Sequence, residues 1–367
     1  MQFLNFLVKK FILLLVILNF YNANAINNLS EKNINNIFSY SIKSQYGYII
    51  IHSQEIRSIK NSYPKGVELN LNWLKNSKKT WELCNCYPKV GILISYFDFD
   101  NNEILGHGIN FGGFVAPSFK ISNDVNFLFK ITSGPSYNSK PYHEANNPYN
   151  LSYSLRLNIY TQLSISIEKK INKKNKIILS CNYNHISNGG IKQPNKGINY
   201  PTIGLGIEHN SEEFKLIERK KERYTGIKEK RYDISFSYFP KKVLEDAKYY
   251  PVFGLNSSYS KQISRTNALT IDLEFTLDKT LEISNQKLNK LEIVRSGILI
   301  GHEFLLGKFR FSQKIGPYIY DKVKVNDVFY QKYGIKYILV KNIFVGLHIK
   351  AHRHVADFMQ LSIGLSF

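Results

Sequence analysis

Apolar and polar side chains alternate along most of the chain, in segments of about ten residues separated by Asn, Ser, Lys and Gly. Alternate residues of a strand point to opposite faces, so each segment predicts a β-strand with one apolar and one polar face. Repeated strands of this kind are typical of a transmembrane β-barrel, whose apolar face meets lipid. We expect sixteen strands, near 46–54, 66–75, 88–98, 104–119, 125–137, 151–171, 176–187, 200–209, 232–240, 249–264, 267–277, 296–306, 308–319, 328–338, 341–352 and 356–367.

The two ends of the chain favour an exported membrane barrel over a soluble β-sandwich, which would also alternate. Residues 1–25 have the pattern of a signal peptide: two lysines, an apolar run, and Ala23-Asn24-Ala25 as the cleavage site. The apolar run is too short to span a membrane as a helix. The last strand places Leu361, Ile363, Leu365 and Phe367 on one face. A terminal Phe on such a strand resembles the assembly signal of outer-membrane proteins. The expected location is therefore the outer membrane of a Gram-negative bacterium.

The first and second sets of eight strands resemble two copies. Gly134-Pro135 of the first set is echoed by Gly316-Pro317 of the second. The fold prediction is an all-β, antiparallel barrel of the outer-membrane type, either one large barrel of sixteen strands or two units of eight. An eight-stranded barrel is filled by its own side chains, so two small barrels would give no pore. The expected organisation is a signal peptide (1–25), a polar lead-in (26–45), a first barrel region (46–210), a charged linker (211–231) and a second strand region (232–367) that is a degenerate duplicate.

Charge and cysteine content narrow the function classes. The net charge of +21 has two explanations that stay open: a low-GC genome rich in Lys, Asn and Ile, or attraction to an anionic surface such as phosphorylated lipid. Nucleic acid is not an expected partner, because the chain has no basic helix or recognition motif. Cys84, Cys86 and Cys181 are an odd number without regular spacing, so they predict no disulfide framework. Cys84 and Cys86 are expected on one face of a strand. They are either a metal or redox pair or, because no His or further Cys lies nearby, two cysteines without such a role.

One polar stretch, "NHISNGGIKQPNKGINYP" at 184–201, carries candidate chemistry. On the preceding strand the odd-numbered residues are apolar up to Tyr183, and His185 and Ser187 continue that lipid-facing row. If the N-terminus is periplasmic, this strand ends at the outer leaflet, beside the head groups of lipopolysaccharide. Serine becomes a nucleophile when an imidazole takes its proton. Asn188 and the exposed N–H groups of the Gly189-Gly190 turn are candidates for an oxyanion hole.

The stretch "HISNGGIKQPNKGI" resembles the His-x-Ser-Asn motif of the lipid A 3-O-deacylase (PagL) family, also described as acyloxyacyl hydrolases. The resemblance covers roughly 40–210. It implies an eight-stranded outer-membrane barrel that hydrolyses the acyl ester at the 3 position of lipid A, with a His–Ser–acid triad on the outer wall. It implies His185 as the base, Ser187 as the nucleophile and Asn188 as an oxyanion-hole residue. The motif needs neither metal nor cofactor, and the expected partners are lipid A in the outer membrane and, as an open alternative, a second copy in a homodimer.

The chain departs from this family at the position of the acid, where it has Asn199. The nearest downstream acid, Glu208, falls on the opposite, inward face. Asn199 shares the outward face, and an Asn can orient an imidazole, as in Cys-His-Asn proteases. It stabilises the imidazolium less than a carboxylate would, so we expect reduced or absent activity.

Two other functions compete with the deacylase. One is a non-enzymatic barrel, porin-like or structural, that keeps an inactive motif; the other is an outer-membrane acyltransferase. In the second strand set, His352 and His354 lie near the equivalent strand end without a serine. They are either a relic of the first site or ligands for metal or lipid phosphate.

Overall fold

The computed structural model describes residues 36–213, 219–220, 229–242, 248–284, 292–324, 327–353 and 355–367. The predicted signal peptide, His354 and most of the predicted charged linker lie outside the described residues. Within the described ranges, no helix is both long and apolar enough to cross a membrane.

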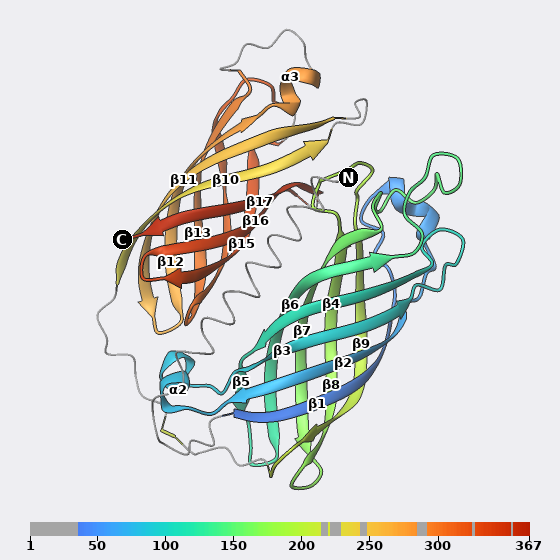
Figure 1. Cartoon of the computed structure of the whole chain (residues 1–367), viewed down its shortest axis with the longest axis vertical. Coiled ribbons are helices and arrows are strands. Elements are labelled where there is room, and N and C mark those ends of the chain that lie inside the picture. The colour runs from blue at the N-terminus through green and yellow to red at the C-terminus, as the bar shows by residue number, and fades with distance from the viewer. Residues whose placement is uncertain are drawn as a thin grey trace. The chain divides into compact units, whose positions relative to one another are not determined.

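The first part of the chain forms a closed antiparallel barrel (Figure 1). Neighbouring strands pair in chain order, β4 pairs with β6, and β1 pairs with β9 to close a circle of eight. The ninth strand, β5, has three residues and adds to β6 beside β4. The elements are β1 (Asn36–Gly47), η1 (Gln54–Ile59), β2 (Lys65–Lys75), α2 (Lys78–Cys84), β3 (Lys89–Asp98), β4 (His107–Ala116), β5 (Ser118–Lys120), β6 (Val125–Asn138), β7 (Leu157–Lys170), β8 (Asn175–Ser187) and β9 (Ile198–Asn210).

The second part forms another closed barrel of eight antiparallel strands, in which β10 pairs with β17. The prediction of an all-β, outer-membrane type of barrel is confirmed. Of the two alternatives, one barrel of sixteen strands or two of eight, the structure shows two eight-stranded barrels. The elements are β10 (Lys230–Lys242), β11 (Tyr249–Ser264), β12 (Asn267–Asp278), α3 (Thr280–Ser284), β13 (Val294–Leu306), β14 (Phe309–Asp321), β15 (Phe329–Val340), β16 (Ile343–His352) and β17 (Val355–Ser366).

Each barrel has an apolar exterior and an interior filled with ion pairs. In the first, Lys89 contacts Glu208 at 2.7 Å, and Glu68 is bonded by Lys43 and Lys130 at 2.7 Å each. In the second, Lys314 contacts Asp272 at 2.7 Å and Lys336 contacts Asp233 at 2.8 Å. Alternation places these charges inward, while Leu, Ile, Phe and Tyr of the other row face outward. Opposite charges satisfy one another there, as buried charges require.

An apolar cluster fills the end of the first barrel at which β8 ends and β9 begins. The chain between β1 and β2 contributes Ile49, Ile56 and Ile59, and the strands contribute Ile186 and Tyr200. These five side chains are at least nine-tenths buried. The cluster therefore ties the β1–β2 connection to the start of β9.

The predicted strand 46–54 is wrong. The first strand is β1, which begins at Asn36 inside the predicted polar lead-in. Its inward row is Ser39, Ser41, Lys43 and Gln45, so little of the strand is apolar enough to stand out. The apolar run Ile49–Ile51 instead belongs to the connection after β1: Ile49 packs in the end cluster, Ile51 packs against it, and Ile50 pairs with Asn199. The predicted strand 104–119 is also interrupted, because Pro117 separates β4 from β5.

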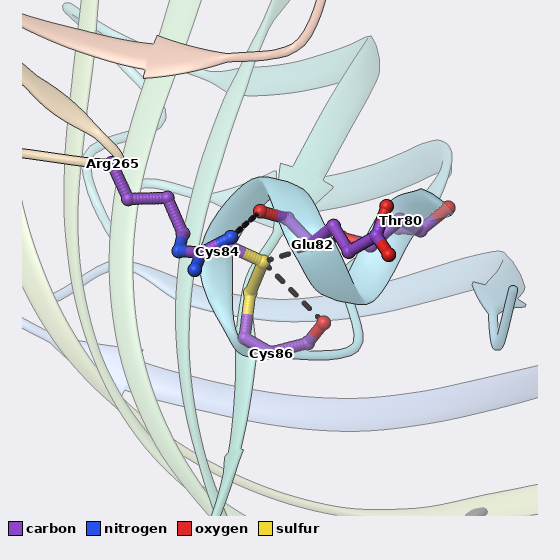
Figure 2. Close-up of a disulfide and its surroundings, with 5 residues drawn as sticks. All are labelled: Thr80, Glu82, Cys84, Cys86 and Arg265. Carbon is purple, nitrogen blue, oxygen red and sulfur yellow. Dashed lines mark hydrogen bonds between the residues drawn. A yellow bond between two sulfur atoms is a disulfide. The ribbon is translucent and has the colours of Figure 1, made fainter. Parts of the chain in front are cut away.

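The two neighbouring cysteines are not on a strand. Cys84 ends helix α2, Asn85 caps the helix in the left-handed conformation, and Cys86 follows. A disulfide joins Cys84 and Cys86 across this turn (Figure 2). The expected placement of the pair on one face of a strand is therefore wrong, because a helix and its C-cap bring the two side chains together. Of the alternatives left open for the pair, the disulfide agrees with a redox pair. Cys181 is free and exposed on β8.

Candidate active site

The β8–β9 hairpin brings the predicted site residues together. Strands β8 and β9 lie side by side in the first barrel (Figure 1). They pair antiparallel, and His185 lies directly opposite Asn199. Ile177, Leu179 and Tyr183 form the exposed row of β8, each with more than two-fifths of its surface accessible. His185 and Ser187 have the same parity and so continue that row at the end of the strand.

Ser187, His185 and Asn199 form a continuous chain of hydrogen bonds. The distance from Ser187 Oγ to His185 Nε2 is 3.0 Å, and the distance from His185 Nδ1 to Asn199 Oδ1 is 2.6 Å. The amide oxygen accepts, so His185 carries its proton on Nδ1 and Nε2 is left to accept the serine proton. This is the hydrogen-bond order of a nucleophile, its base and the group that orients the base.

A second histidine, His52, extends the chain beyond Asn199. Its Nδ1 lies 3.2 Å from Asn199 Nδ2, and its Nε2 lies 3.0 Å from the Lys196 carbonyl oxygen. The Ile50 N–H donates to the backbone carbonyl oxygen of Asn199 at 2.8 Å. This bond attaches this part of the β1–β2 connection to β9. The sequence predicts no role for His52, because no spacing pattern relates it to Asn199, which lies 147 residues further along the chain.

The loop after β8 is organised by Asn188. Its Nδ2 donates to the Lys192 carbonyl oxygen at 2.6 Å, and its Oδ1 accepts from Gly190 N–H at 3.1 Å. Its own backbone N–H donates to Asn195 Oδ1 at 2.8 Å. The nitrogen and the oxygen of the Asn188 side-chain amide are thus both hydrogen-bonded. The side-chain nitrogen of Asn195, Nδ2, has no hydrogen-bond partner among the described residues.

Glycine is required at position 197, directly beneath the histidine. Gly197 has φ +72°, a region that side chains disfavour. A Cβ at this position would lie 2.9 Å from His185 Cε1 and 3.4 Å from Ser187 Cβ. The backbone therefore approaches the His–Ser pair more closely than any other residue type would allow.

The other two residues considered from the sequence lie apart from this chain. Glu208 belongs to the inward row at the opposite end of β9, where it pairs with Lys89 and Lys176. His352 lies on the inward row of β16, and its Nε2 is 3.0 Å from the Tyr318 hydroxyl. His352 thus does not repeat the outward placement of His185. The described residues hold no group of three or more His, Cys, Asp or Glu suited to a metal ion.

Closed eight-stranded antiparallel barrels with apolar exteriors define the class of this protein as an outer-membrane β-barrel. Two family models match it: "Lipid A 3-O-deacylase (PagL)" over residues 65–208 and "Acyloxyacyl hydrolase, C-terminal domain" over residues 230–367. The chain belongs to this family, in an extended form in which a second barrel follows the first. Family membership implies a hydrolase located in the outer membrane.

Solved structures show distant similarity. The outer membrane enzyme PagL is 15% identical, covering 45% of this chain and 97% of that chain with a TM-score of 0.34. Neisserial surface protein A is 7% identical, covering 47% and 96% with a TM-score of 0.33. OccK5 (OpdH) of Pseudomonas aeruginosa is 9% identical, covering 91% and 97% with a TM-score of 0.25. No curated protein sequence matches the chain. The family assignment rests on the family models.

Proposed function

We propose that this protein removes the ester-linked acyl chain at the 3-O position of lipid A, with Ser187 as the nucleophile. The observation that carries the proposal is the hydrogen-bonded chain from Ser187 through His185 to Asn199 on the outward-facing row of the β8–β9 hairpin. Ser187 itself is buried, with 6% of its surface accessible. A periplasmic N-terminus would place the end of β8 in the outer leaflet. There the hydroxyl would meet an acyl ester of lipid without entering the barrel interior.

In the proposed reaction, Ser187 Oγ attacks the ester carbonyl while His185 Nε2 takes the hydroxyl proton. The bond from the carbonyl carbon to the sugar oxygen then breaks, and His185 returns the proton to that oxygen. A water molecule, deprotonated by the same nitrogen, attacks the acyl-serine and releases the 3-hydroxy fatty acid. Asn199 Oδ1 holds the imidazole in the orientation that both steps need.

The oxyanion of each tetrahedral intermediate needs N–H donors near the end of β8. We assign this role to the backbone N–H of Gly189, where the left-handed conformation turns the chain two residues after the nucleophile. The Asn188 N–H is not assigned to it, because it already donates to Asn195 Oδ1. The Asn188 side chain serves to hold that turn, through its bonds to Lys192 and Gly190. Asn195 Nδ2, the donor without a partner, is a second candidate.

Mass spectrometry of lipid A from cells with and without the protein tests the proposal. We expect loss of one 3-hydroxy fatty acid from lipid A, together with release of that acid. Ser187→Ala should abolish the loss, because the nucleophile is removed. Ser211→Ala is the matched control, since this exposed serine lies past β9 at the opposite end of the barrel.

Other results assign a different function. An acyl chain moved to another lipid would identify a transferase, and lipid A unchanged by the wild-type protein would leave a non-enzymatic barrel. Acyl loss that persists with Ser187→Ala would exclude this nucleophile. Asn199→Asp should hydrolyse lipid A as fast as the wild type or faster, because a carboxylate stabilises the imidazolium better than an amide.

A further inference from the structure

We infer that His52 is a positioning residue that fixes the direction of the Asn199 amide and, through it, the tautomer of His185. The inference rests on the proposed function, since it assigns a role within the same site. The geometry that points to it is the unbroken hydrogen-bonded chain Ser187–His185–Asn199–His52–Lys196.

An amide raises a problem that a carboxylate does not. A carboxylate accepts hydrogen bonds at both oxygens, whereas an Asn side chain has an acceptor on one side and a donor on the other. If the Asn199 amide were turned over, its Nδ2 would donate to His185 Nδ1 and force the proton onto Nε2. The nitrogen that must take the serine proton would then already hold one. Conversion of a triad to this wrong tautomer costs about 10⁴-fold in kcat in a serine protease.

The contacts of His52 remove this ambiguity. Two carbonyl oxygens, which can only accept, lie near the imidazole: that of Lys196 at 3.0 Å from Nε2 and that of Ile50 at 3.3 Å from Nδ1. The shorter contact, and the Asn199 amide beside Nδ1, favour the proton of a neutral His52 on Nε2. His52 Nδ1 is then an acceptor, and it faces Asn199 Nδ2 at 3.2 Å. This contact directs Asn199 Oδ1 toward His185, which places the His185 proton on Nδ1.

The carbonyl that sets this order is itself held in place. Lys196 N–H donates to the Leu151 carbonyl oxygen at 3.0 Å, and Gly197 N–H donates to the Ser152 carbonyl oxygen at 2.7 Å. On the side of His52, Ile50 N–H donates to the Asn199 carbonyl oxygen at 2.8 Å. Three backbone segments of the first barrel, 50–52, 151–152 and 196–199, are thus bonded to one another beside His52.

A double-mutant comparison of lipid A deacylation tests the inference. His52→Leu should lower kcat by at least about tenfold and at most about 10⁴-fold, the cost of a complete change of tautomer. In the Asn199→Asp background, the same substitution should cost less than about threefold, because a carboxylate needs no direction. Activity of that double variant also shows that the barrel has folded. His209→Leu is the matched control, since His209 bonds Asn175 at 2.8 Å at the opposite end of the barrel.

Equal losses in both backgrounds, or no loss in either, would overturn the role of His52 while leaving Ser187 as the nucleophile. If neither the wild type nor Asn199→Asp hydrolyses lipid A, the proposed function fails, and a second measurement decides on His52. Two-bond ¹H–¹⁵N spectra of histidine-labelled protein refolded in detergent report each tautomer. We expect the Nδ1–H form of His185 in the wild type and conversion toward the Nε2–H form in His52→Leu. An unchanged His185 tautomer in that variant would exclude the inference.

Discussion

Three of the candidate site residues are close in sequence. Strand alternation selected His185 and Ser187, and the resemblance to the family motif selected Asn199. Strand alternation puts His185 and Ser187 in one row, and a short hairpin returns the chain so that Asn199 faces His185. His52 was beyond reach of the sequence, because its contact with Asn199 depends on pairing between the first and last strands of the barrel. The internal bonds of Asn188 were equally hidden, since they depend on the folded shape of the loop.

A substitution at Gly197 tests how closely the backbone must approach the His–Ser pair. Gly197→Ala should reduce deacylation by more than about 10²-fold, because a misplacement of about 1 Å is enough for such a loss. The new Cβ would lie 2.9 Å from His185 Cε1, and φ is +72°. The measurement is the rate of acyl release from lipid A by refolded protein. Gly113→Ala is the control, because a Cβ there meets nothing within 4 Å. Equal rates for both variants would show that the site tolerates the displacement.

At the scale of strands, alternation located fifteen of the sixteen barrel strands to within a few residues but misplaced the first. The inward row of β1 is polar because it faces the ion pairs of the interior, so hydropathy alone made the segment resemble a lead-in. Ile49–Ile51 had the hydropathy of a strand, but these residues pack in the end cluster or beside it. An apolar run indicates burial, whether it forms a strand or a packed connection. Only regular pairing with a neighbouring strand distinguishes the two.

Ion pairs in the interior join strands beyond the ladder hydrogen bonds. Glu68 on β2 bonds Lys43 on the neighbouring strand β1 and Lys130 on β6, which does not pair with β2. Glu68→Ala should lower the free energy of unfolding by about 3–5 kcal/mol, because two buried ammonium groups lose their partner. Urea unfolding of the refolded protein, followed by tryptophan fluorescence, measures this change. Lys65 lies on the same strand as Glu68, and Lys65→Ala breaks its exposed pair with Asp100. This variant should leave the unfolding midpoint unchanged. Similar midpoints for both variants would indicate that water replaces the missing carboxylate.

At the scale of the whole molecule, the sequence predicted two similar sets of strands but not whether they close into one barrel or two. Closure is decided by the pairing of β1 with β9 and of β10 with β17, which joins residues far apart in the chain. Alternation is the same in an eight-stranded and a sixteen-stranded barrel, so no local pattern separates them. The ion pairs in each interior are a further consequence of closing at eight strands, since these barrels are just wide enough for side chains.

These filled interiors predict that the protein conducts no ions. Lys89 with Glu208 in the first barrel, and Lys314 with Asp272 in the second, occupy the space that water would need. We expect no step in current when purified protein is added to a planar lipid bilayer, under conditions in which a sixteen-stranded porin opens channels. Stable single-channel steps would contradict the description of two separate, filled barrels.

The pairing of β1 with β9 also sets an order of events. The β8–β9 hairpin holds the proposed nucleophile Ser187, the proposed base His185 and Asn199, whereas His52 reaches Asn199 only when the circle of strands closes. A chain still in transit, with its first and last strands apart, would carry a hydroxyl and an imidazole whose amide partner is free to turn. Full hydrolytic rate would then begin with the completion of insertion, and the lipids met on the way to the outer leaflet would be spared.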